Sequence, residues 1–185
     1  MKFLRFFLII FISLTSTVKA DLNKNLIEKL KKGEKIIFIR HAYAPGSGDP
    51  DNFNLNDCST QRNLSNEGRE QAKKIGKFFH KNKIEIEKVI SSEWCRCKET
   101  AEIAFKQFST KNFLNSFYSP KYRKNKDRQI YELKKHIDSS KIKKNLILVT
   151  HYVVISEVLN YASSSGEIVV SDKNLNIIGN IKFNY

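Results

Sequence analysis

Arginine and histidine side chains recur where predicted strands end. Four of them follow apolar runs of the chain, namely Arg40, His41, Arg96 and His151. In a parallel sheet the carboxyl ends of the strands lie side by side, and ligands bind at that edge. We therefore expect two guanidinium groups and two imidazoles to meet at one place. Arginine forks match phosphate oxygens bidentately, so this set favours a phosphoryl group, and no metal-ligand spacing accompanies it.

Strands and helices alternate along the chain and position these residues. The hydrophobic pattern predicts strands at 35–39, 84–92, 145–150, 167–171 and 176–183. It predicts helices at 23–32, 65–80, 94–108, 127–138 and 153–161, with Ser65 as an N-cap. The alternation is typical of the α/β class, here a three-layer α/β/α sandwich with a mostly parallel central sheet. The turn-rich segment 45–52 begins just after His41 and is expected to cover or shape the site.

The first 20 residues have the features of a secretory signal peptide. A basic start precedes the apolar core at 4–14, and Val18 and Ala20 provide the small residues of a cleavage site. The apolar stretch is shorter than the roughly 20 residues that a membrane span requires. We expect cleavage after Ala20, a single domain at 21–185, a periplasmic or secreted protein, and no stable membrane anchor once the signal is removed.

The chain is strongly basic, with 33 Lys and Arg against 19 Asp and Glu and a formal net charge of +14. Most of the excess is lysine scattered over the predicted helices. Solvated helix faces explain such a distribution, and attraction to anionic surfaces or phosphorylated substrates is the alternative. The lysines are not interleaved with aromatic residues in a nucleic-acid-binding motif, so we expect no nucleic-acid partner.

The three cysteines are Cys58, Cys95 and Cys97. Cys95 and Cys97 lie two residues apart on a predicted helix, where their side chains point to different faces and do not easily bridge. In an oxidising compartment we expect a disulfide from Cys58 to one of them, with the third thiol free. Three unpaired thiols are the alternative. The bridge would tie the loop after the first strand to the segment that carries Arg96.

Four motifs in order resemble the histidine phosphatase superfamily, also called phosphoglycerate mutase-like. They are Arg-His-Ala at 40–42, Leu-Ser-Asn-Glu-Gly-Arg-Glu-Gln-Ala at 64–72, Ser-Ser-Glu-Trp-Cys-Arg-Cys-Lys-Glu-Thr-Ala at 91–101 and Val-Thr-His at 149–151. The resemblance covers most of the chain after the signal. The segments 57–101 and 165–167 are most similar to a small exported bacterial branch.

The resemblance implies a phosphatase that uses a histidine nucleophile. His41 would accept the phosphoryl group and form a phosphohistidine, while Arg40, Arg96 and His151 would hold the phosphate oxygens. His41 must be neutral to attack, and the adjacent arginines would lower its pKa. Neither a metal nor a cofactor is expected, because the arginines supply the positive charge.

The proton donor to the leaving group is the open part of this prediction. A carboxylic acid usually supplies the proton, and the acid phosphatase branch has an aspartate where this chain has Tyr152. The candidates are Glu167, which we favour because it follows a glycine at a strand entry, and Asp127. Glu99 is less suitable because it belongs to the Arg96 helix. Substrates with good leaving groups would need no dedicated acid.

Substrate and partner predictions are correspondingly coarse. Arg62, just before the Ser65 helix, would either contact substrate or pin its own loop. The expected ligand is a phosphorylated small molecule or an envelope sugar phosphate, hydrolysed as a phosphomonoester. The alternatives are a non-catalytic periplasmic module that binds phosphorylated envelope ligands and, less in keeping with export, a phosphomutase.

Overall fold

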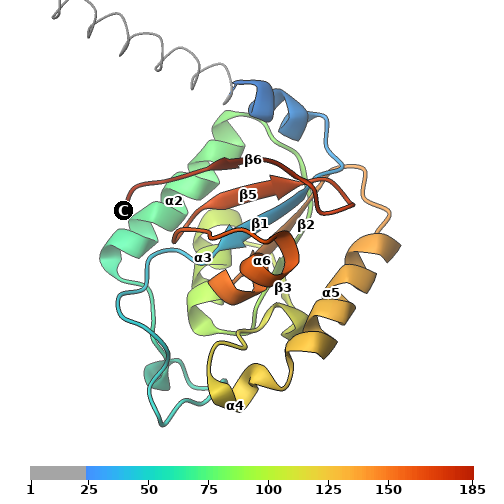
Figure 1. The fold of residues 1–185 in the computed structure, drawn as a ribbon. Helices are drawn as coiled ribbons and strands as arrows, with labels where there is room; N and C mark the ends of the chain where they lie inside the picture. The colour runs from blue at the N-terminus through green and yellow to red at the C-terminus, as the bar shows by residue number, and fades with distance from the viewer. Residues whose placement is uncertain (1–23) are drawn as a thin grey trace, which may run out of the picture.

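The computed structural model describes residues 24–185, and the predicted signal peptide lies outside them. One six-stranded sheet forms the centre, in the order β3-β2-β4-β1-β5-β6 (Figure 1). The strands are β1 (Ile36–Arg40), β2 (Ile86–Ser91), β3 (Ser109–Thr110), β4 (Asn145–Thr150), β5 (Ile168–Ser171) and β6 (Ile177–Ile181). The first four in spatial order are parallel, whereas β5 and β6 are antiparallel to their neighbours. The predicted mostly parallel α/β fold is confirmed.

Helices cover both faces of the sheet. They are a helix at 24–31, α2 (Asn66–Lys81), α3 (Cys95–Phe105), α4 (Pro120–Arg123), α5 (Lys126–Ser139) and α6 (Tyr152–Leu159), with 3-10 turns η1 (Cys58–Thr60) and η2 (Asn112–Leu114). The helix at 24–31 packs with α2 and α3 on one face, and α5 and α6 pack with η2 on the other (Figure 1). Among residues 24–185 no helix is long and apolar enough to cross a bilayer.

The alternation of side chains along β1 divides the core in two. Ile37 and Ile39 point into the cluster under α2 and α3, while Ile36 and Phe38 point into the cluster under α5 and α6. All four are fully buried. Because apolar side chains fill both faces, β1 is fixed in the middle of the sheet, and so is the position of its carboxyl end.

The start of α2 holds the backbone that follows β1. Ser65 caps the helix by accepting a hydrogen bond from the Gly68 amide at 3.2 Å, as predicted. A Cβ at position 68 would collide with the carbonyl of Tyr43, so only glycine allows this approach. Gln71, one turn later, accepts the Tyr43 amide at 2.9 Å. The helix thus fixes the loop that leaves the first histidine.

The differences from the sequence prediction are local. The strand β3 and the short helix α4 were not predicted, because two residues of strand and four of helix leave no measurable period. Helix α3 ends at Phe105 and not at 108, because Lys106 adopts a positive φ of 67°. Helix α6 ends at Leu159, two residues earlier than predicted, where Asn160 is left-handed.

Candidate active site

A cavity of about 330 Å³ opens at the carboxyl ends of the parallel strands. Arg40 is the last residue of β1, His41 follows it, Arg96 lies in the first turn of α3, and His151 is the N-cap of α6. All four line the cavity, as does Arg62. The register places Arg40 beside Thr150, and Ser91 beside Val149, so that the carboxyl ends of β1, β4 and β2 lie side by side. The structure therefore brings together Arg40, His41, Arg96 and His151, which were predicted to meet at the ends of the strands.

The imidazole of His41 is buried and held in one orientation. Its Nδ1 lies 2.8 Å from the carbonyl oxygen of Ala42, so Nδ1 must carry the proton and donate it. That assignment leaves Nε2 without a proton, and Nε of Arg96 donates to it over 3.3 Å. Burial, and then the positive charge of Arg96, lower the pKa of His41 well below 6.5. His41 is thus neutral at pH 7, as a nucleophile must be.

His151 adopts the opposite tautomer. The hydroxyl of Ser92 has an acceptor in Asn115 Oδ1 at 3.0 Å, so its oxygen is free to accept from His151 Nε2 at 2.8 Å. The bare Nδ1 of His151 then faces Nη2 of Arg96 at 3.5 Å. Burial and the charge of Arg96 lower the pKa of His151 well below 6.5 as well. Both histidines consequently present a lone pair to the same guanidinium group.

The guanidinium group of Arg40 belongs to the lining of the cavity. Arg40 donates from Nη1 to the carbonyl of Ser163 at 2.7 Å and lies over the ring of Tyr152, 5.5 Å from its centroid. Its Nε has no hydrogen-bond partner within the described residues. Burial lowers the pKa of Arg40, although its charge remains at neutral pH. The Nε atom of Arg40 is thus a buried donor without a partner, on a side chain that lines the cavity.

Arg62 reaches the cavity but is anchored to the loop around it. Its Nε donates to the carbonyl of Gly48 at 2.8 Å, and Nη1 donates to the carbonyl of Ala44. Burial, and then the neighbouring Arg96, lower the pKa of Arg62 to about 10. The side chain thus pins its loop and also lines the cavity, while contact with substrate stays a prediction.

Asp49 is the site residue that the sequence reasoning missed. Its carboxylate accepts Nη1 and Nη2 of Arg96 at 2.7 and 3.2 Å. It also accepts the indole N–H of Trp94 at 3.0 Å and the backbone amide of Arg62 at 3.2 Å. Burial acts to raise its pKa, but the hydrogen bonds and charge of Arg96 outweigh burial and lower it. The one signal in the sequence was an acidic residue in a turn-rich loop that follows His41.

The same arrangement of motifs is found in known proteins. Residues 36–115 match the histidine phosphatase superfamily (branch 1), and this stretch contains Arg40, His41 and Arg96. This stretch, somewhat less than half of the chain, is therefore similar to the histidine phosphatase superfamily. It is 39% identical over 84 residues to the mitochondrial serine/threonine-protein phosphatase Pgam5 of Drosophila mojavensis, a match that covers 45% of this chain. The match spans 25% of that relative's length.

Solved structures share the architecture of this chain. The protein histidine phosphatase SixA, determined with tungstate, aligns with a TM-score of 0.54 at 14% identity, covering 82% of this chain and 94% of SixA. Phosphoglycerate mutase from Thermus thermophilus aligns with a TM-score of 0.53 at 16% identity, covering 81% of this chain and 99% of the mutase. At these identities the comparison shows a shared fold alone.

The position of Glu167 conflicts with the predicted role of proton donor. The side chain is fully buried and does not line the cavity. Its carboxylate accepts hydrogen bonds from the Tyr161 hydroxyl at 2.7 Å, the Ser164 amide at 2.7 Å and Nδ2 of Asn180 at 2.6 Å. These partners use the carboxylate to fix the loop before β5. A buried anion that is satisfied in this way has no route to a leaving group.

The second predicted acid also lies outside the cavity. Asp127 is 95% exposed on the first turn of α5 and makes only a 3.8 Å ion pair with Lys126. It does not line the cavity. The carboxylates that do so are Asp49, which Arg96 holds, and Asp51 in the same loop.

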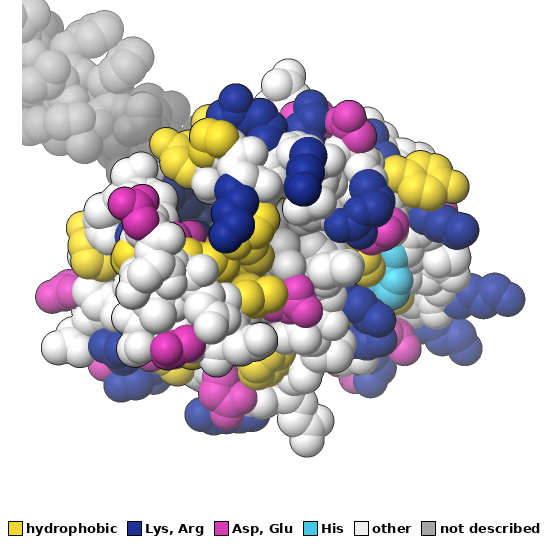
Figure 2. Space-filling model, turned by 90° about the horizontal axis from the view of Figure 1, so that it is seen from below, with side chains coloured by type: hydrophobic (Ala, Val, Ile, Leu, Met, Phe, Trp, Pro, Cys, Tyr) yellow, Lys and Arg dark blue, Asp and Glu magenta, His cyan; other side chains and the backbone are white. Residues whose placement is uncertain are grey.

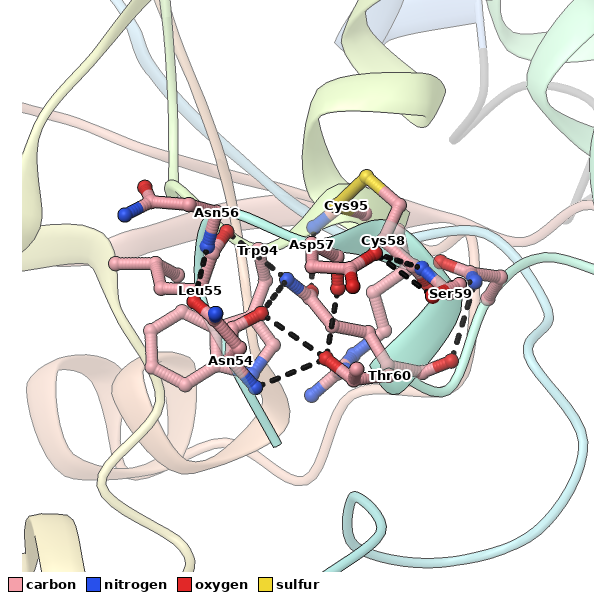
Figure 3. Close-up of a disulfide and its surroundings, with 12 residues drawn as sticks. Asn54, Leu55, Asn56, Asp57, Cys58, Ser59, Thr60, Trp94 and Cys95 are labelled. Atoms are coloured by element: carbon pink, nitrogen blue, oxygen red, sulfur yellow. Dashed lines mark hydrogen bonds between the residues drawn. A yellow bond between two sulfur atoms is a disulfide. The ribbon is translucent and has the colours of Figure 1, made fainter. Parts of the chain in front are cut away.

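A disulfide joins Cys58 to Cys95, one of the two predicted pairings, and leaves Cys97 free and buried. Figure 3 shows the bridge linking η1 to the start of α3, directly before Arg96. Gln61 reinforces the link by accepting the Cys95 amide at 2.9 Å. Burial raises the pKa of the Cys97 thiol to about 12, so that it is not a reactive thiolate. The loop over the site is thus covalently tied to the helix that carries Arg96.

Aromatic rings form one wall of the cavity. Phe53 stacks on Trp94 with centroids 5.0 Å apart, and Tyr122 meets Trp94 edge-on at 5.7 Å.

Outside the cavity, Lys and Arg side chains are interspersed with Asp and Glu, as Figure 2 shows from the side on which α4 lies. Among residues 24–185 no group of three or more His, Cys, Asp and Glu side chains is placed to hold a metal ion.

Proposed function

We propose that this protein is a phosphatase that hydrolyses phosphomonoesters through a phosphohistidine on His41. The observation that carries the proposal is the unprotonated Nε2 of His41, which faces Arg96 within a cavity that Arg40 and His151 also line. A bare imidazole nitrogen is a nucleophile, and the guanidinium groups around it match the charge of a phosphoryl group.

In the first step, Nε2 of His41 attacks phosphorus and the bond to the leaving oxygen breaks. The proton on Nδ1 stays in its hydrogen bond with the Ala42 carbonyl, which disperses the positive charge that develops on the ring. The donors available to the phosphate oxygens are Nε and Nη2 of Arg96, and Arg40 adds the charge of a guanidinium group from the cavity lining. Phosphoryl transfer depends mainly on such positioning and charge compensation.

In the second step, water attacks the phosphohistidine, the phosphorus–nitrogen bond breaks, and His41 is restored with its lone pair. His151, whose Nδ1 faces the same region, is placed to hydrogen-bond the water or a phosphate oxygen. The two steps need no metal ion, because the arginines compensate the charge of the phosphate in both of them.

The leaving group limits the substrate class. Glu167 and Asp127 lie outside the cavity, and four N–H groups engage Asp49, so none of these three is poised to protonate an alkoxide. Asp51 is the other carboxylate of the cavity lining, and it lies in an exposed turn. This favours substrates with good leaving groups, such as acyl phosphates or phosphohistidine. SixA, named a protein histidine phosphatase, has the same fold and fits this class. Pgam5 is named a serine/threonine-protein phosphatase, which makes phosphoprotein serine the competing class.

We further propose export to the periplasm or beyond, in keeping with a small exported branch of the superfamily. The signal-like residues 1–20 and the Cys58–Cys95 disulfide support this, because disulfides persist in oxidising compartments. An envelope sugar phosphate or another small phosphorylated molecule is the partner in that setting. A non-catalytic binding module is less favoured, since binding alone does not require two neutral histidines. A phosphomutase is less in keeping with export.

Phosphate release from a panel of substrates tests the proposal. The panel contains acetyl phosphate, phosphohistidine, an aryl phosphate and alkyl phosphates, with EDTA present and with a His41→Ala variant in parallel. We expect metal-independent release that is fastest for the first two and absent in the variant. Release that the variant retains, or that EDTA abolishes, would contradict the mechanism.

A further inference from the structure

The guanidinium of Arg96 is divided between two sets of partners. Its end, formed by Nη1 and Nη2, binds the two carboxylate oxygens of Asp49 at 2.7 and 3.2 Å. Its side, formed by Nε and Nη2, faces Nε2 of His41 at 3.3 Å and Nδ1 of His151 at 3.5 Å. A guanidinium group offers such edges as separate bidentate forks. One fork is therefore occupied by a carboxylate while the other faces the two histidines.

Asp49 is itself firmly placed. Besides Arg96 it accepts the indole N–H of Trp94 and the backbone amide of Arg62, and its side chain is only 17% exposed. The loop reaches this position through Gly46 and Gly48, whose φ angles of 87° and 68° suit glycine. Asp49 thus has more contacts than an ion pair at the surface, and these contacts come from two parts of the chain, Arg62 and the segment 94–96.

We propose that Asp49 is a positioning residue, which holds the end of the Arg96 guanidinium so that its side faces both histidines. This inference rests on the proposed function. An incoming phosphate would take the side of Arg96, replacing the hydrogen bonds to His41 and His151, without displacing Asp49. The arginine then donates to the phosphoryl group from a fixed direction during transfer, and misplacement of such a group costs rate more than affinity.

The four N–H donors around Asp49 argue against two other roles for this residue, proton donor to the leaving group and obstruction of the phosphate-binding edge. They stabilise the ionised carboxylate, which makes Asp49 a poor proton donor to a leaving group. Asp49 binds only the end of the Arg96 guanidinium group, so it does not obstruct the side that a phosphate would use. The negative charge offsets part of the positive charge that Arg96 exerts on the adjacent His41.

The Asp49→Asn variant tests the proposal, with Asp51→Asn as the comparator. The comparator removes one negative charge from the same loop, but Asp51 does not contact Arg96. For Asp49→Asn we expect kcat to fall by about 100-fold on all leaving groups alike, the scale of a misplaced catalytic donor. KM should not rise, because the loss of a negative charge does not weaken the binding of an anion. On substrates with good leaving groups, the effect of Asp51→Asn on kcat should be much smaller.

The pH profile of kcat/KM gives a second readout, which loss of structure alone would not move. His41 is faced by Arg40, Arg62, Arg96 and His151. Without the carboxylate, Arg96 lowers the pKa of His41 further, so the acid limb should move to lower pH in Asp49→Asn. The ionisation of the substrate is measured separately. An unmoved limb, together with a higher KM and a lower melting temperature, would overturn the proposal in favour of a loop-stabilising role.

Two other outcomes would also overturn it. A loss of activity confined to alkyl phosphates would make Asp49 a proton donor, and a rise in kcat/KM would make it an obstruction that substrate displaces. If the parent releases no phosphate, the proposed function fails, and NMR still decides the role of Asp49. A slowly exchanging Arg96 Nε–H resonance should be present in the parent and in Asp51→Asn, and lost or broadened in Asp49→Asn. An unchanged resonance in Asp49→Asn would rule out the positioning role.

Discussion

Nε of Arg96 donates a hydrogen bond to Nε2 of His41 over 3.3 Å. The contact has two consequences for a phosphoryl-transfer site. It places a positive charge against the nucleophilic nitrogen, which keeps that nitrogen unprotonated at neutral pH. In the proposed mechanism it also places the donor for a phosphate oxygen at the point of attack. Substrate binding therefore exchanges one hydrogen-bond acceptor of Arg96 for another.

Stability should fall as the pH drops through 6.5. Burial and the charge of Arg96 lower the pKa of both His41 and His151 in the folded protein. Near pH 6.5 the unfolded chain binds protons at these positions that the folded protein does not, so protonation favours unfolding. Urea unfolding at pH 7.5 and pH 5.5 should show a lower free energy at the lower pH, and His151→Asn should reduce the difference. Equal stability at both values would contradict this account of the buried histidines, and the exposed His80 replaced by Gln serves as the control.

Replacement of Glu167 by Gln should act on stability and not on proton transfer. The substitution weakens three buried hydrogen bonds, so we expect a loss of about 1–3 kcal/mol in the free energy of unfolding. The ratio of rates on alkyl and aryl phosphates should match that of the parent. A selective loss on alkyl phosphates, with stability unchanged, would restore Glu167 as the proton donor.

Loss of the disulfide should destabilise the domain strongly. The bridge closes a loop with a sequence separation of 37, for which the chain-entropy model gives about 3–4 kcal/mol. Cys58→Ser should show this loss in urea unfolding, and reduction of the parent should reproduce it. The free Cys97 replaced by Ala controls for the removal of a thiol. A change below about 1 kcal/mol would mean that noncovalent contacts, such as that of Gln61 with the Cys95 amide, hold the loop without the bridge.

Arg62→Gln distinguishes loop anchoring from substrate contact. The wild-type guanidinium donates to the carbonyls of Ala44 and Gly48, so its removal should loosen the loop that carries Asp49. We expect kcat/KM to fall about 10-fold for every substrate, the scale of a lost hydrogen bond to a charged donor. Kinetics on substrates with one and two phosphate groups provide the check. A loss restricted to substrates with two phosphates would instead indicate direct contact.

Regular elements explain why much of this site is predictable from sequence. Arg40 ends β1 and His151 directly follows β4, two neighbouring strands that are buried on both faces. The carboxyl ends of parallel strands lie at the same edge of the sheet. Ser65 precedes a periodic helix and caps it. These placements follow from periodicity and capping, which act over a few residues. The motif resemblance added the expected roles of the residues but not their contacts.

The residues that escaped prediction are placed by contacts between distant parts of the chain. Asp49 lies in a loop without a period, and its position depends on Trp94 and Arg96, which lie more than 40 residues further along the sequence. Glu167 follows a glycine, which suggested an accessible turn, but Tyr161 and Asn180 close over it. A sequence shows that a carboxylate is present, whereas tertiary packing decides whether it faces a cavity or a buried network.

Trapping the covalent intermediate tests the central claim most directly. The protein is mixed with acetyl phosphate, quenched in alkali, in which phosphohistidine survives, and digested for mass spectrometry. We predict one phosphoryl group on the peptide that contains His41, formed and lost at rates that account for turnover, and absent in His41→Ala. A phosphoryl group on His151, or phosphate release without any phosphorylated histidine, would contradict the assignment of His41 as the nucleophile.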